Sequence, residues 1–205
     1  MSARRILGLL ALIALLTAAG GCIFSPDDDE GGGTPPPKPE LDFPDSPAKL
    51  MSNFQTIYEE KNFDWYRDML HPDYRTILQQ ETIDQFPDVG EALELDEELR
   101  IHERMFSGDD LTDPNGEFVP GVIDISYGKF QPELDWQVSP VDDPIPNALF
   151  APYDVELLFN RGQGHSQISV KGQIRFYVTS KDSLHEGTPK QYYQMVGQVD
   201  LTTIN

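Results

Sequence analysis

Four histidines are the first residues to consider for acid–base chemistry, because imidazole titrates closest to neutral pH. His102 is the one expected to face inward, since it follows Leu95 and Leu99 at helical spacing. As a general base it would act with a nearby carboxylate such as Asp64. The alternative, a hydrogen-bonded core histidine, has more support because a lone His among Leu and Met residues is more often a core residue than a catalyst. The remaining histidines fall at a predicted helix end or in predicted loops: His71, His165 and His185.

The sequence predicts neither a metal site nor a cofactor. No two histidines have the spacing of a metal-ligand pair on one element. Residues 109–116 resemble part of a calcium loop, but the first and twelfth ligands would then be Leu111 and Val122, which cannot coordinate calcium. A polar turn is the simpler interpretation. The sequence also contains no glycine-rich phosphate loop and no serine nucleophile motif.

The charge of the chain limits its partners. It has 15 Lys and Arg against 35 Asp and Glu, which gives a net charge of −20. A field of this sign repels phosphate backbones, so nucleic acid is not an expected partner. Cys22 is the single cysteine, which excludes an intramolecular disulfide and a cysteine-based zinc site.

Residues 1–21 have the three parts of an export signal. Arg4 and Arg5 provide the positive start, residues 6–19 form an apolar run, and small residues precede Cys22. The apolar run is too short for a permanent membrane-spanning helix. We therefore expect residues 1–21 to be a signal peptide.

The residues from Ala19 to Cys22 resemble the lipobox of bacterial lipoproteins. They depart from the commonest pattern, because a branched residue such as Leu is usual where Ala19 stands. The resemblance implies a diacylated Cys22 thiol, cleavage just before Cys22, acylation of the new amine by a fatty acid such as palmitate, and anchoring to a membrane of the bacterial cell envelope. Ile23, where an Asp would favour the inner membrane, points to the outer membrane. The alternative is an ordinary secretory signal with an incidental cysteine.

Residues 22–45 are expected to form a tether, because an acidic run, three glycines and a proline-rich stretch cannot bury a core. Residues 46–205 are expected to form one α+β domain. Apolar residues at helical spacing predict helices from Ser46, after Asn62, and over 91–106. Ser46 can cap the first of them.

Alternating apolar residues predict strands in the rest of the domain, and turns between them favour an antiparallel sheet with one apolar face. The alternation covers five segments, at 122–130, 134–138, 155–159, 168–178 and 195–201. Gly172 is expected at a bend or bulge. Residues 142–146 and 181–190 read as loop insertions.

The segment 54–78 resembles the nuclear-transport-factor-2-like (NTF2-like) superfamily, which includes SnoaL-like proteins. The family's marks fall on Tyr58, Asn62, Asp64, Leu70 and Asp73. The resemblance implies a cone in which three N-terminal helices pack on a curved, mostly antiparallel sheet. Its mouth can hold a small molecule, and the expected lining is Phe54, Tyr58, Trp65 and His102.

The resemblance also bears on catalysis. In ketosteroid-isomerase-like members a Tyr on the first helix and an Asp on the first strand do the chemistry, and these positions fall on Phe54 and Leu78 here. Neither side chain can transfer a proton, so a non-catalytic ligand-binding or protein-assembly module is the leading interpretation. The alternatives are a pocket enzyme of the isomerase, dehydratase or hydrolase kind that uses His102, and a structural dimer. The partners left open are a small apolar ligand, another envelope protein and a second copy of the chain.

The lipid anchor makes a direct prediction. In a bacterial host the protein should take up labelled palmitate and partition into detergent, because several acyl chains bind a membrane firmly. Cys22→Ser should abolish both properties. A Ser variant that is still labelled and membrane-bound would contradict the assignment.

Overall fold

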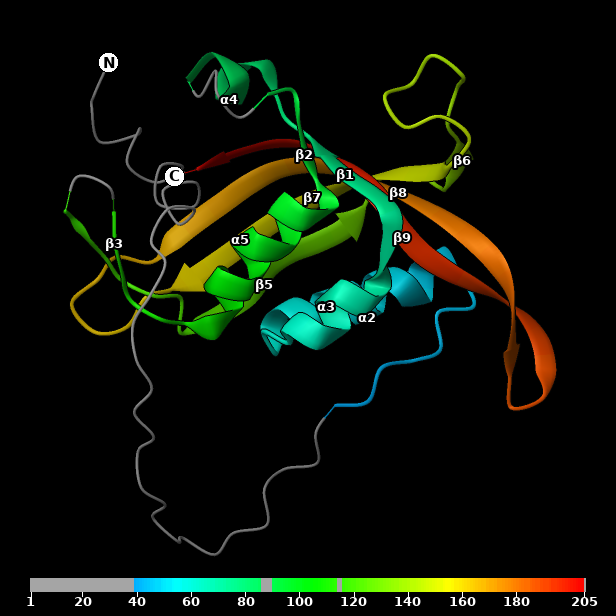
Figure 1. The fold of residues 1–205 in the computed structure, drawn as a ribbon, viewed down its shortest axis with the longest axis horizontal. Coiled ribbons are helices and arrows are strands. Elements are labelled where there is room, and N and C mark those ends of the chain that lie inside the picture. Colours follow the sequence, from blue (N-terminus) through cyan, green and yellow to red (C-terminus); the bar gives the residue numbers. More distant parts are fainter. Residues whose placement is uncertain (1–38, 86–89, 114–115, 205) are drawn as a thin grey trace, which may run out of the picture.

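The computed structural model describes residues 39–85, 90–113 and 116–204, and their side chains except those of 85 and 202–204. The expected signal peptide, Cys22 and most of the expected tether lie outside these residues. Within the described ranges no helix is long and apolar enough to cross a membrane. The structure is a mixed α+β fold with one curved, mostly antiparallel sheet, which confirms the predicted class (Figure 1).

The helices differ in number and order from the prediction of three at the N-terminal side. Four are described: α2 (Pro47–Glu59), α3 (Phe63–Met69), α4 (Gln80–Gln85) and α5 (Leu95–Ser107). Strands β1 (Leu70–Ile77) and β2 (Ala92–Glu94) are interleaved with them, so the helices are not a separate N-terminal layer. The predicted 91–106 helix begins only at Leu95, because residues 92–94 pair with β1.

Local signals explain where the main helices begin and end. Ser46 accepts a hydrogen bond from the backbone N–H of Lys49, as predicted for the N-cap of α2. Glu94 and Glu97 form a capping box at the start of α5. Gly108 ends α5 in the left-handed conformation, with φ of 74°.

The remaining strands are β3 (Leu111–Thr112), β4 (Phe118–Val119), β5 (Asp124–Pro132), β6 (Gln137–Val138), β7 (Leu149–Asn160), β8 (Ile168–His185) and β9 (Thr188–Ile204). The main sheet has the order β2-β1-β9-β8-β7-β5, with β6 also paired to β7. Only the β1–β9 pair among the described strands is parallel. Strands β3 and β4 form a separate small hairpin.

Two details of the sheet correct the sequence-based prediction. The 181–190 stretch is not a loop, because β8 and β9 stay paired out to His185 and Thr188 and form a long ribbon beyond the main sheet (Figure 1). Gly172 keeps its pairing with both neighbouring strands, and the β8–β9 register shifts instead between Tyr177 and Val178. This irregularity adds to the curvature of the sheet.

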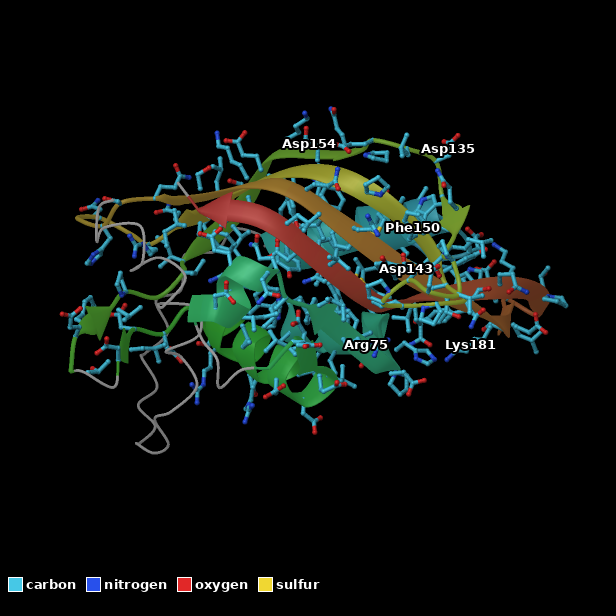
Figure 2. The ribbon with its side chains drawn as sticks, turned by 90° about the horizontal axis from the view of Figure 1, so that it is seen from above. Arg75, Asp135, Asp143, Phe150, Asp154 and Lys181 are labelled. Atoms are coloured by element: carbon cyan, nitrogen blue, oxygen red, sulfur yellow. The ribbon has the colours of Figure 1, made fainter. Side chains whose placement is uncertain are left out.

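Helices α2, α3 and α5 lie over one face of the sheet, and the main core lies between them (Figure 1). A smaller core contains Ile145 and Ala148, from the loop that follows β6, and Tyr177 from β8. In that loop Asp143 pairs with Arg175 at 3.5 Å, and Arg75 donates to the carbonyl of Pro144. Arg75, Asp143 and Phe150 lie in this part of the molecule (Figure 2).

Residues 41–45, expected to belong to the tether, pack against the domain. The Asn53 side-chain amide donates to the carbonyl of Asp42 at 2.6 Å and accepts from its N–H at 3.1 Å. The ring of Phe43 stacks on His185 at 4.2 Å, and the buried Pro44 accepts from the N–H of Tyr193. The ordered domain therefore starts before residue 46.

We expect these contacts to be measurable in truncated proteins. A domain that begins at residue 39 should keep its contacts, whereas one that begins at residue 46 should lose about 2–4 kcal/mol of unfolding free energy. Chemical denaturation of both proteins would measure the difference. Equal stabilities would show that residues 41–45 contribute nothing to folding. Phe43→Ala in the longer domain should lower the free energy of unfolding by part of the same amount.

Candidate functional site

A cavity of about 220 Å³ lies between α5 and the concave face of the sheet. Its walls have different chemistry. Strands β7 and β8 contribute apolar side chains such as Leu157, Val170 and Ile174. The rest of the lining, here called the polar wall, contains Tyr58 from α2, Glu98 and His102 from α5, and three residues of the sheet itself, Thr76 from β1 and Gln198 and Asp200 from β9.

The segment after α5 closes one end of the cavity, to which it contributes Leu111 and residues 119–122. Its path requires glycine at position 121, because a Cβ there would lie 2.0 Å from the carbonyl oxygen of Gly108. The ammonium group of Lys61 donates to the carbonyl of Val122 at 2.8 Å. The base of this segment is therefore held against the end of α5.

His102 is buried in the polar wall and makes hydrogen bonds through both ring nitrogens. Its Nδ1 lies 3.0 Å from the backbone carbonyl oxygen of Glu98 and 3.3 Å from Oε1 of the same residue. Both atoms are acceptors, so Nδ1 carries the proton. Nε2 then accepts a hydrogen bond from the Tyr58 hydroxyl at 2.6 Å.

Glu98 is the centre of the polar wall and is only 2% exposed. The hydroxyl of Tyr66 donates to Oε1 at 2.7 Å, and the hydroxyl of Thr76 donates to Oε2 at 2.9 Å. The Tyr74 hydroxyl lies 3.1 Å from the Thr76 oxygen and 3.4 Å from Oε1 of Glu98. One carboxylate therefore connects α5 with α3 and β1 and, through His102, with α2.

The electrostatics of this wall favour a neutral histidine and neutral tyrosines. Burial lowers the pKa of His102, although the charge of Glu98 opposes the shift. Burial and then the Glu98 charge raise the pKa values of Tyr58, Tyr66 and Tyr74 well above the ordinary value. At neutral pH these tyrosines act as hydrogen-bond donors.

Three of the four side chains expected to line the cavity do so: Phe54, Tyr58 and His102. Trp65 does not, because the inward face of α3 carries Tyr66 and Met69 and leaves Trp65 half-buried at the edge of the core. Phe54 and Leu78, the two positions of the resemblance that cannot transfer protons, both lie on the cavity wall.

The prediction that Asp64 is the carboxylate partner of His102 was wrong. The Asp64 side chain is 75% exposed in the first turn of α3, where it pairs with Arg67 at 3.0 Å. The carboxylate that contacts His102 is Glu98, which sequence reasoning missed. The signal was present, since Glu98 precedes His102 by four residues and so lies on the same helix face.

The other histidines lie apart from the cavity lining. His71 is in β1 rather than at a helix cap, and its Nδ1 accepts from the N–H of Asp73. His165 lies in the turn between β7 and β8 beside Phe118. His185 ends β8 and stacks on Phe43. No group of three or more acidic, His or Cys side chains within the described ranges is arranged to hold a metal ion.

Comparisons with known proteins agree with the fold and go no further. No protein-family model and no curated protein sequence matches the chain. A conserved protein from Planctomyces limnophilus is similar over 77% of this chain and 94% of its own, with 7% sequence identity and a TM-score of 0.50. An NTF2-like protein from Cytophaga hutchinsonii covers the same shares, with 11% identity and a TM-score of 0.38. The first similarity shows a shared fold.

The Tyr58–His102 hydrogen bond makes a prediction for stability. His102→Leu should lower the free energy of unfolding by about 2–3 kcal/mol, because it leaves the buried Tyr58 hydroxyl without its acceptor. Tyr58→Phe should cost about 1–2 kcal/mol. The double variant should cost less than the sum by about 1–2 kcal/mol. Strict additivity in a denaturation double-mutant cycle would show that the two groups do not interact.

Proposed function

We propose that this protein is a lipid-anchored component of the bacterial cell envelope whose NTF2-like domain binds a small, mainly apolar ligand without catalysis. The observation that carries the proposal is the cavity, which combines apolar side chains with a group of hydrogen-bonded polar side chains. Ligand sites in proteins commonly have this composition, with apolar contacts for affinity and few polar groups for orientation.

The size of the cavity limits the ligand. An apolar cavity of about 150 Å³ is large enough for benzene. The 220 Å³ here would accept a substituted aromatic ring or a short branched chain. It is small for a drug-sized or steroid-sized molecule, since pockets for such ligands begin near 300 Å³.

The anchoring part of the proposal rests on the sequence alone. The apolar run before Cys22 and the small residues beside it support processing and acylation. The residues between Cys22 and the start of the ordered domain would let that domain bind its ligand away from the bilayer. Ile23 supports the outer membrane as its location.

A second candidate is a pocket enzyme, favoured by the contact series from Glu98 through His102 to Tyr58. A neutral histidine beside a cavity can act as a general base once a ligand takes the place of the Tyr58 hydroxyl as the hydrogen-bond partner of Nε2. In this case His102→Leu would lower turnover of a substrate by roughly two to four powers of ten while the fold stays intact. If His102→Leu weakens ligand binding and the wild type converts no substrate, the binding module is favoured.

The cavity can be tested by filling it. The wild type should bind members of a panel of neutral compounds such as 2-phenylethanol and indole, measured by chemical-shift titration. Val170→Phe places a larger ring at the cavity wall and should weaken binding about tenfold or more. Val141→Phe is the matched control because that side chain is 86% exposed and outside the lining. No binding of any neutral compound by the wild type would contradict the proposal.

A further inference from the structure

We propose that the ligand of this cavity carries a protonated amine, which lies against the wall formed by Tyr58, Glu98 and Asp200. This inference rests on the proposed function, since it specifies the chemistry of the molecule that the cavity binds. The reason is a buried negative charge that the described part of the chain leaves without a cation.

Both oxygens of the buried Glu98 carboxyl group act as hydrogen-bond acceptors. Oε1 accepts from the hydroxyl of Tyr66 and Oε2 from the hydroxyl of Thr76. The residue is only 2% exposed, so these protein groups replace most of its contact with water.

No positive charge in the described ranges neutralises this carboxylate. Its single ion-pair partner there is His102, and burial lowers the pKa of that imidazole and so favours the neutral form at neutral pH. Two arginines line the same cavity. Arg161 directs Nε and Nη2 to the carbonyl of Ser166, and Arg104 makes no ion pair with Glu98. A buried charge without a counter-charge is unfavourable, and a bound cation would relieve it.

The polar wall also lacks free hydroxyl protons near Glu98. Tyr58 donates its proton to His102, while Tyr66 and Thr76 donate theirs to Glu98. The Tyr58 oxygen, whose proton is directed to His102, therefore presents lone pairs as an acceptor on the cavity wall, and Asp200 adds a second carboxyl group from β9. An ammonium group has three donors and no acceptor, which matches this surface.

The overall charge of the chain also favours a cation. The net charge of −20 raises the local concentration of cations around the molecule. A carboxylate ligand would meet repulsion from Glu98 and Asp200.

A matched series of ligands tests the inference. The compounds 2-phenylethylamine, 2-phenylethanol and phenylacetate share one ring and differ in charge. We expect the wild type to bind the amine about tenfold more tightly than the alcohol, and phenylacetate most weakly. Equal binding of the amine and the alcohol would overturn the inference and leave the proposed function standing. If the wild type binds none of these three compounds and no other neutral probe, the proposed function itself is contradicted.

Variants of the carboxyl groups test which charge causes the preference for the amine. Glu98→Gln should reduce the preference for the amine over the alcohol about fivefold or more. Glu103→Gln is the matched control, because it makes the same change on the exposed side of α5 and should keep the preference. Asp200→Asn provides a second test if Glu98→Gln does not fold, and should also reduce the preference. A preference unchanged in every folded variant of these two positions would overturn the inference.

Discussion

The burial of the Glu98 carboxylate constrains the whole helical side of this fold. A carboxylate that is 2% exposed must have its lost hydration replaced by hydrogen bonds, and the hydroxyl donors come from two elements, α3 and β1. Tyr66 of α3 and Thr76 of β1 donate hydrogen bonds to Glu98, and His102, which contacts Glu98, accepts a hydrogen bond from Tyr58 of α2. The relative positions of these elements are therefore set by directional bonds in addition to apolar packing.

The same arrangement explains why a cavity exists. The helices cover the concave face where aromatic rings fill the space, as in the contacts among Phe54, Tyr58 and Phe176. Beyond α5 the cover is a loop and a small hairpin, which line the cavity together with Leu157 and Val170 of the sheet. The polar wall lies at the boundary between these two regions.

Sequence reasoning found the parts that follow a simple period and missed those fixed by long-range contacts. His102 was correctly placed inward because helical spacing determines the buried face of α5. Glu98 shares that face, but a charged residue is expected outside, and its three donors lie 22 to 32 residues away along the chain. Asp64 was the wrong carboxylate, because the buried face of α3 carries Tyr66 and Met69 and Asp64 lies on its exposed side. The 181–190 stretch was predicted as a loop because it lacks a regular apolar alternation. Its strands form through backbone pairing between the end of β8 and the start of β9.

Glu98 also links stability to binding. Replacing a buried charge with a well-packed apolar side chain is often neutral or stabilising, so a core optimised for stability alone would not need it. Here the carboxylate lies beside an open space, and the adjacent histidine stays neutral at neutral pH because burial outweighs the attraction of the charge. The unfavourable desolvation in the empty protein then becomes a favourable interaction when a cation enters. A cationic ligand of the proposed kind should therefore stabilise the fold by an amount that rises with the logarithm of its concentration above Kd.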